Sequence, residues 1–371
     1  MSLRILHTES SWGWGGQELR ILTESSAMIS RGHAVSIAGP PDTPLLREAE
    51  QRGIEAVPLQ ICKKRLAGLL AIRRLLKSRE FDVVNTHSST DSWLTALACA
   101  TLRRPPKIVR TRHVSTPVRP TLANRWLFGK ACAAVVTTGE AVREMLIRDL
   151  KLDPAKVISV PTGVDSEIYH PVSAEEKVKL RQILGLPQNQ VIVGTVATLR
   201  FLKGIEYLFE AIRLLNDERV LLCVVGDGPQ RQRLESWIQD NGMQKKIMMV
   251  GEQRNVNEWL QSFDIFAFPS LAEGVPQALA QAMLTELPCV TTNVGGIPEL
   301  AIHGETALVI EPKAAPKLAE NIQIVINDPE FADNLGKQSR GFCGEKHSVN
   351  HMSAHMERVF YEATTPAPDK A

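Results

Sequence analysis

Residues 191–204 read VIVGTVATLRFLKG, a continuously apolar stretch that passes into a short loop with two basic side chains. Residues 221–225, LLCVV, form a second run of the same kind. Strands that are apolar on both faces are typical of parallel sheets covered by helices on both sides, because antiparallel strands usually keep one polar face. The two runs therefore predict an α/β fold with parallel strands.

Short β-branched runs alternate with longer helical stretches along the whole chain. This alternation predicts two doubly wound, Rossmann-like sheets. The expected strands are residues 4–7, 34–38, 82–86, 107–111, 134–138 and 157–160 in the first half, and 191–197, 220–225, 247–250, 265–268, 289–292 and 307–310 in the second. A turn-rich segment at 161–171 interrupts the pattern. We therefore expect one domain over residues 1–166, a second over 172–345, and a C-terminal helix over 346–363 that returns to the first domain.

The composition excludes several classes of protein. With 371 residues, of which 44% are hydrophobic and 23% charged, the chain has an ordinary globular balance. Its net charge of +2 does not indicate the strongly basic surface that is typical of nucleic-acid-binding proteins. The apolar runs are too short to span a membrane and the first residues lack a signal-peptide pattern, so we expect a cytoplasmic protein. The six cysteines are scattered without Cys-x-x-Cys spacing, which favours packing over disulfides or metal binding.

A glycine-rich segment, SSWGWGGQE at residues 10–18, follows the first expected strand and opens a helix. Gly15 and Gly16 allow backbone N–H groups to approach a phosphate, and the helix N-terminus adds positive potential. However, Glu18 stands where a dinucleotide-binding motif has its third glycine, and no clear ribose-binding acid ends the second strand. A nicotinamide-dependent oxidoreductase is therefore disfavoured. The alternative to a phosphate site is a tight turn with no ligand.

Two loops in the second half also follow strands. Arg200 and Lys203 stand three residues apart after the strand at 191–197, where two fixed cations can hold a diphosphate. Gly226 begins a Gly-Asp-Gly-Pro turn after the strand at 220–225. Each loop has a simpler interpretation: a solvated loop for the first and a tight turn for the second.

The segment PSLAEGVPQALAQAM at residues 269–283 is the most informative. Its loop presents Glu273, and Gly274 and Val275 lead into a helix that begins near residue 276, with Gln281 inside that helix. Backbone donors at the helix start suit a phosphate or a sugar, while Glu273 and Gln281 offer acceptors for a sugar and a ribose. Glu273 as a plain solvated carboxylate is the alternative.

Four motifs in this order resemble glycosyltransferase family 4, whose members are retaining enzymes of the GT-B fold. They are Pro-Thr-Gly-Val-Asp at 161–165, in which Thr162 replaces the Asn of the family, the Arg…Lys-Gly element at 200–204, Gly-Asp-Gly-Pro at 226–229 and Gly-Gly-Ile-Pro-Glu at 295–299. The resemblance covers nearly the whole chain. It implies two Rossmann-like domains facing a central cleft. It also implies a hexosyltransferase that moves a sugar from a UDP- or GDP-linked donor to a hydroxyl acceptor, such as lipopolysaccharide or another envelope glycolipid.

The resemblance also assigns roles to residues. Glu273 and His113 take the catalytic positions, with His113 contacting the donor sugar and His87 as the competing histidine. The donor-binding positions are Gly15, Gly16, Arg200, Lys203, Gly226, Gly274, Val275 and Gln281. At Gln281 the family signature has a second Glu. Glutamine keeps an acceptor oxygen but loses the charge, so we expect retained activity with weaker nucleotide binding.

No Asp-x-Asp metal clamp occurs in the sequence, so we expect a metal-independent reaction with no cofactor besides the donor. A basic amphipathic segment at 62–79 is either a domain helix packed on its sheet or a surface that docks on an anionic membrane, where a lipid-linked acceptor would lie. Two other functions stay open. One is a different GT-B activity, such as a nucleotide-sugar epimerase or hydrolase, and the other is a weakened family member that binds sugar nucleotides.

Overall fold

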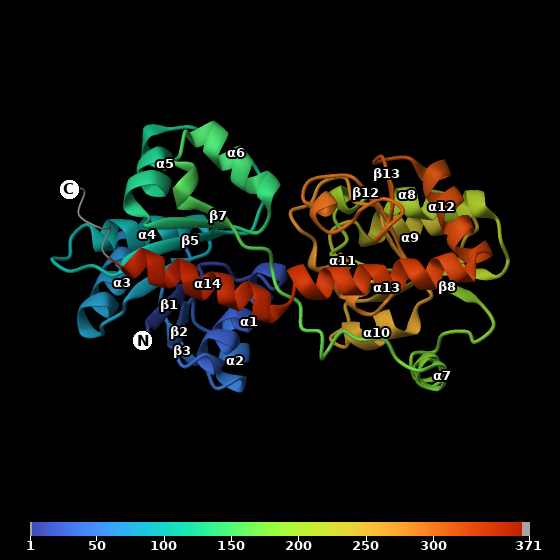
Figure 1. The fold of residues 1–371 in the computed structure, drawn as a ribbon, viewed down its shortest axis with the longest axis horizontal. Helices are drawn as coiled ribbons and strands as arrows, with labels where there is room; N and C mark the ends of the chain where they lie inside the picture. Colours follow the sequence, from blue (N-terminus) through green and yellow to red (C-terminus); the bar gives the residue numbers. More distant parts are fainter. Residues whose placement is uncertain (1, 366–371) are drawn as a thin grey trace. The chain divides into compact units, whose positions relative to one another are not determined.

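The computed structural model describes residues 2–365 and divides the chain into two compact units. Unit 1 is built from residues up to 163 and from 349 onward, and unit 2 from residues 164–348. Each unit contains one parallel sheet flanked by helices (Figure 1). The predicted α/β fold with two doubly wound sheets is confirmed.

Unit 1 has a seven-stranded sheet in the order β3-β2-β1-β4-β5-β6-β7. Its strands are β1 (Arg4–Thr8), β2 (Ala34–Gly39), β3 (Glu55–Pro58), β4 (Val83–Thr86), β5 (Lys107–Arg112), β6 (Ala134–Thr137) and β7 (Val157–Ser159). The sequence analysis missed β3. This strand pairs only with β2 at the sheet edge and is half-exposed, so it lacks the apolar run by which the other strands were predicted.

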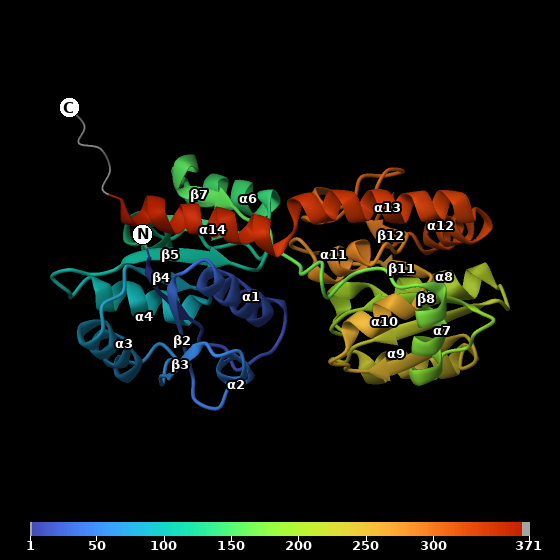
Figure 2. The same ribbon diagram turned by 60° about the horizontal axis from the view of Figure 1, so that its bottom comes forward.

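The helices of unit 1 cover both faces of its sheet. They are α1 (Gly16–Ser30), α2 (Pro44–Gln51), α3 (Leu66–Ser78), α4 (Ser89–Cys99), α5 (Leu122–Trp126), the π-helical turn η1 (Leu127–Ala131), α6 (Glu140–Leu150), the 3₁₀ turn η2 (Pro154–Lys156) and α14 (Val349–Thr364). Figure 2 shows α3 and α4 on one side of β4 and β5, and α14 on the other. Along β1 the side chains alternate accordingly, because Leu6 packs in the core under α3 and α4 while Ile5 packs against α14.

The last helix, α14, belongs to the core of unit 1 although it follows unit 2 in the sequence. Met352, Met356 and Phe360 are at most 1% exposed and pack with Ile5 and Val83 from the sheet. The chain therefore passes from unit 1 into unit 2 once and returns once.

Unit 2 has a six-stranded parallel sheet in the order β10-β9-β8-β11-β12-β13. Its strands are β8 (Val191–Val196), β9 (Val220–Val225), β10 (Ile247–Gly251), β11 (Ile265–Phe268), β12 (Cys289–Thr292) and β13 (Leu308–Ile310). The apolar run that opened the sequence analysis is β8, which lies in the middle of this sheet between β9 and β11.

The helices and helical turns of unit 2 pack against its sheet and form two hydrophobic cores with it. They are α7 (Ala174–Ile183), η3 (Phe201–Lys203), α8 (Ile205–Leu215), α9 (Arg231–Asp240), α10 (Val256–Ser262), α11 (Gln277–Leu284), η4 (Ile297–Glu299), α12 (Ala315–Asn327) and α13 (Pro329–Lys346). Local sequence explains the start of α7, which has a capping box: the Ser173 hydroxyl accepts from the Glu176 N–H, and the Glu176 carboxylate accepts from the Ser173 N–H. Among the described residues, none of these helices combines the length and apolar character needed to cross a bilayer.

Candidate functional site

The two sheets share one topology, and in both the predicted site residues lie after the strands at the point where the strand order reverses or after a strand next to it. Read by position along the chain, each order begins third-second-first-fourth, so the first and fourth strands are neighbours whose following connections run to opposite sides. In such sheets ligands bind outside the carboxyl ends of the strands at this switch point. In unit 2 the switch point lies between β8 and β11, and in unit 1 between β1 and β4.

In unit 2 the switch point joins Lys203 to Glu273. Lys203 ends η3 after β8, and Glu273 lies in the loop after β11. Lys203 Nζ lies 2.5 Å from Glu273 Oε1, and Ser270 Oγ donates to the same oxygen at 2.6 Å. The side chains are 24% and 10% exposed, so the pair is largely withdrawn from solvent. The structure therefore places a cation and a carboxylate in contact, whereas the sequence predicted a diphosphate contact for Lys203 and a sugar contact for Glu273.

Glycines fix the backbone around Glu273. Gly295 has φ +58°, and a Cβ built there would stand 1.9 Å from the Glu273 carbonyl oxygen. The next glycine, Gly296, donates from its N–H to the Gly274 carbonyl at 3.1 Å. A side chain at Gly295 would therefore both strain the backbone and push the Glu273 loop away.

The other predicted donor-binding residues of unit 2 follow β8, β9 and β11. Arg200 is exposed at the start of η3, and within residues 2–365 its side chain forms no ion pair. Gly226 follows β9, and its N–H donates to the Gly251 carbonyl at 2.7 Å. Val275 is half-buried just before α11, and Gln281 is a half-buried residue inside that helix. The structure thus brings Lys203 and Glu273 into contact but leaves Arg200 outside that contact.

In unit 1 the switch point holds a buried carboxylate, Glu9, that the sequence analysis missed. Glu9 follows β1 directly and is fully buried. Its Oε1 accepts from the Ser11 N–H at 2.7 Å and from the Ser88 hydroxyl, and its Oε2 accepts from the Gln17 amide. Burial raises the pKa of Glu9. The carboxylate links the glycine-rich loop to the start of α4, and its position after an apolar strand was the available signal.

The predicted glycines of unit 1 directly precede Gln17, whose side-chain amide donates to Glu9. Gly15 is the N-cap of α1 and Gly16 is the first residue of that helix. Glu18, in the first turn, is buried, and burial raises its pKa. The hydrogen bond from Gln17 to Glu9 shows that this loop is held by side-chain hydrogen bonds as well as by backbone geometry.

Three histidines form a continuous hydrogen-bonded chain in unit 1. His7 Nδ1 lies 2.9 Å from His87 Nε2, and His87 Nδ1 lies 2.9 Å from His113 Nε2. His7 and His87 are buried, while His113 at the end of β5 is half-buried. The two candidate histidines are therefore direct neighbours. His7, which the sequence analysis missed because it lies inside an apolar strand, is the third member.

Burial keeps these imidazoles uncharged. It lowers the pKa of His7 to about 3, and it also lowers the pKa of His87 and of His113 well below the ordinary value. The nearby charge of Arg20 acts in the same direction on all three. A neutral histidine carries one ring proton and so has one donor and one acceptor nitrogen. This chain therefore offers hydrogen bonds but no charge at neutral pH.

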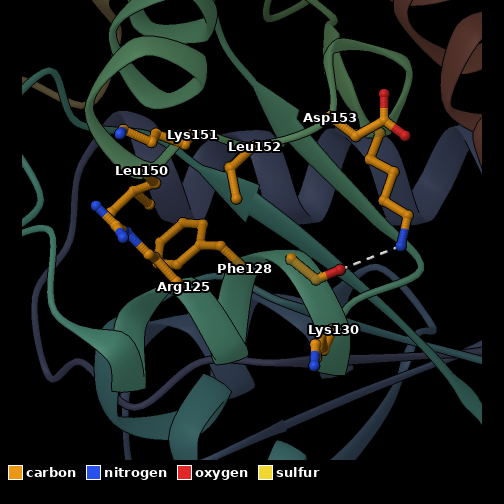
Figure 3. Close-up of a pocket in the computed structure, with 9 residues that line it drawn as sticks. Arg125, Phe128, Lys130, Leu150, Lys151, Leu152 and Asp153 are labelled. Atoms are coloured by element: carbon orange, nitrogen blue, oxygen red, sulfur yellow. Dashed lines mark hydrogen bonds between the residues drawn. The ribbon is translucent and has the colours of Figure 1, made fainter.

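A pocket of about 420 Å³ occupies a different part of unit 1 (Figure 3). Its basic members include Arg125, Lys130 and Lys156, and Lys156 Nζ donates to the Gly129 carbonyl at 3.1 Å. Lys130 lies shortly before β6, and Lys156 directly precedes β7. The pocket therefore lies toward the amino ends of these strands, at the edge opposite the candidate residues.

Across residues 2–365 no group of three or more His, Cys, Asp or Glu side chains is arranged to hold a metal ion.

Comparison with known families matches both units. The model described as "Glycosyltransferase Family 4" matches residues 14–168, and the model described as "Glycosyl transferases group 1" matches residues 176–342. A curated relative from Escherichia coli is UDP-Gal:alpha-D-GlcNAc-diphosphoundecaprenol alpha-1,3-galactosyltransferase. It is 30% identical over 246 residues, a match that covers 63% of this chain and 63% of that enzyme.

Solved structures share the fold over nearly the full length. A glycosyltransferase from Rickettsia africae superimposes with a TM-score of 0.89 at 19% identity, covering 99% of this chain and 100% of the other. HepE from Anabaena, crystallised in complex with UDP and glucose, gives a TM-score of 0.85 at 20% identity, covering 97% and 99%. At these identities the likeness establishes the fold.

Proposed function

The chain belongs to the family 4 glycosyltransferases, and we propose that it transfers a sugar from a nucleoside diphosphate sugar to a hydroxyl group of an acceptor, with retention of the anomeric configuration. The Escherichia coli relative is named for the transfer of galactose from UDP-Gal, and the Anabaena protein was crystallised with UDP. These names favour UDP over GDP as the nucleotide of the donor.

The contact between Lys203 and Glu273 carries this proposal. An ammonium group has three donors, so Lys203 can bond Glu273 and still donate to diphosphate oxygens. Lys203 and Ser270 both contact Oε1 of Glu273, which leaves Oε2 to accept from a sugar hydroxyl. As the sugar–oxygen bond breaks, negative charge grows on the diphosphate, and a cation fixed beforehand stabilises that charge.

The proposed reaction needs no separate protein base. The bond between the anomeric carbon and the β-phosphate oxygen breaks, and the acceptor oxygen forms its bond on the same face of the sugar. The acceptor proton passes to the departing phosphate oxygen, so charge and atoms balance. We propose that the protein supplies fixed charges and hydrogen bonds, and that the reaction uses no metal ion.

For the acceptor we propose a lipid-linked glycan at the cytoplasmic face of a membrane. The Escherichia coli relative is named for a diphosphoundecaprenol acceptor. Helix α3 packs on its sheet through Ile72 and Leu76, and its outer side leaves Leu66 71% exposed and Leu70 43% exposed beside exposed basic residues. Flotation with anionic and neutral vesicles tests this part. Salt-sensitive flotation with anionic vesicles alone is expected, and no flotation with either would contradict it.

Calorimetric titration of UDP into the protein and two variants tests the donor site. Lys203→Ala removes a charged hydrogen bond to the diphosphate, a loss of about 1.5–3 kcal/mol that corresponds to a tenfold or greater loss of affinity. Lys177→Ala is the matched control, because Lys177 forms a similar ion pair with Asp264 at 2.7 Å, before β11 rather than after it. Equal affinity of the parent and Lys203→Ala would contradict the assignment of Lys203 to the diphosphate.

A further inference from the structure

The histidine chain of unit 1 runs across three neighbouring strands. His7 lies in β1, His87 follows β4, and His113 follows β5, and these strands are adjacent in the sheet. The planes of the inner pair of rings differ by 12° at a centroid distance of 5.2 Å, and those of the outer pair by 34° at 5.1 Å. The chain thus connects a fully buried imidazole with a half-buried one at the carboxyl edge of the sheet.

Two consecutive bonds between neutral imidazoles leave only two arrangements of protons. His87 uses both of its ring nitrogens, so it must donate through one and accept through the other. Either all three rings carry the proton on Nδ1, or all three carry it on Nε2. The tautomer of one ring therefore sets the tautomers of the other two.

A buried ion pair at the inner end decides between the two arrangements. Glu24 is fully buried on α1, with Oε2 at 3.5 Å from Arg20 Nε, and its Oε1 accepts from Asn85 Nδ2 at 3.1 Å. Burial raises the pKa of Glu24, while the charge of Arg20 and the hydrogen bond from Asn85 lower it. A buried guanidinium keeps its charge and needs an anionic partner, so we assign Glu24 as the carboxylate. Its Oε1 lies 4.0 Å from His7 Nε2, a nitrogen that is buried and has no hydrogen-bond partner among the described residues. A proton on this nitrogen is attracted by the carboxylate, whereas a lone pair there is repelled.

We propose that Glu24, acting through His7 and His87, holds His113 in its Nε2–H tautomer, so that Nδ1 of His113 presents a lone pair that accepts a hydrogen bond from a ligand hydroxyl group. Glu24, His7 and His87 are positioning residues in this scheme, and His113 is the residue that meets the ligand. The identity of that ligand as a sugar substrate rests on the proposed function. The tautomer itself does not.

Long-range ¹H–¹⁵N spectra of the full-length protein, labelled with ¹⁵N-histidine and measured near pH 7.5 without ligand, test the proposal. The correlation pattern distinguishes the two tautomers of each ring, and His87→Asn and His113→Asn identify the signals. The expected result is the Nε2–H tautomer for His7, His87 and His113. An Nδ1–H tautomer at His113, or a positively charged ring, would overturn the proposal.

Variants test the role of the carboxylate. In Glu24→Gln the amide oxygen is favoured beside Arg20, so the amide N–H faces His7 and Asn85. The Asn85 amide then turns over, so that its oxygen accepts from Gln and its N–H donates to Thr111, and the histidine chain is expected to reverse to the Nδ1–H form. Ser25→Ala, at the next buried position of α1, is the matched control and leaves the spectra unchanged. If Glu24→Gln does not fold, His7→Phe disconnects the outer rings from Glu24, and mixed tautomers of His87 and His113 are expected. Unchanged tautomers in whichever of these two variants folds would overturn the proposal.

Kinetics separate this proposal from the proposed function. With a UDP-sugar donor, Glu24→Gln is expected to lower kcat/KM at least tenfold, while Ser25→Ala keeps the parent value. A protein that transfers no sugar but shows the Nε2–H tautomers would refute the proposed function and leave the tautomer inference standing. A protein that is active and keeps its kcat/KM in Glu24→Gln despite a reversed tautomer would overturn the role given to Nδ1.

Discussion

Replacing His7 by Phe should make unit 1 less sensitive to acid. Burial lowers the pKa of His7 from its ordinary value of 6.5 to about 3 in the folded protein. Between these values the unfolded chain binds a proton that the folded chain does not, so acid favours unfolding. The stabilising contribution of neutral His7 is present above pH 6.5 and is lost as the pH falls toward 3.

The size of this effect follows from the two pKa values. At pH 5 the solution lies 1.5 units below the unfolded value, and each unit is worth about 1.36 kcal/mol, so protonation of the unfolded chain costs about 2 kcal/mol of stability. At pH 7 the cost is close to zero. Burial raises the pKa of Asp91, and a carboxyl with a raised pKa in the folded state makes folding more favourable as the pH falls. The total pH dependence of the parent is therefore a sum of opposed effects. The comparison with His7→Phe isolates the histidine, because Asp91 is present in both proteins.

Pulse proteolysis in urea at pH 7 and pH 5, with quantification of peptides from unit 1, measures the required free energies. We expect the loss of stability between pH 7 and pH 5 to be about 2 kcal/mol smaller in His7→Phe than in the parent. The same pH dependence in both proteins would refute the view that His7 is buried in its neutral form.

Three further predictions concern unit 2 and the reaction. Gly295→Ala should lower the stability of unit 2 by about 2–4 kcal/mol and displace Glu273, whereas Gly304→Ala, at φ +78° with open space around it, should cost only about 1 kcal/mol; urea denaturation measures both. Gln281→Glu should strengthen UDP binding about three- to tenfold by restoring a charged acceptor, and calorimetry showing equal or weaker binding would contradict a ribose contact. Transfer activity should survive EDTA, and loss of activity that is restored by a divalent ion would contradict the metal-independent reaction.

Much of the fold could be predicted from the sequence because its strands are apolar on both faces. The strand at 191–197 and the run at 221–225 were visible for this reason and correspond to β8 and β9. The edge strand β3 escaped prediction because half of its surface meets solvent and its short sequence ends in proline. Local patterns therefore report burial, and they fail where an element is only partly buried.

The candidate site was less visible because its contacts depend on sheet order. Lys203 and Glu273 are 70 residues apart, and they meet because β11 inserts beside β8, which no local pattern reports. His7 looked like a residue of an apolar strand, and only the adjacency of β1, β4 and β5 joins it to His87 and His113. The prediction of a basic amphipathic helix was easier, since it needs only the helical spacing within α3.

The return of α14 to unit 1 has a consequence for biosynthesis. A ribosome releases the chain from its N-terminus, so residues 164–348 emerge before the segment that supplies Met352, Met356 and Phe360. The sheet of unit 1, which is synthesised first, keeps part of one apolar face uncovered until α14 has been made. Unit 2 by then has all of its own core residues. A polypeptide released after residue 348 would thus expose Ile5, Val83 and their neighbours to chaperones, although unit 2 has its complete core.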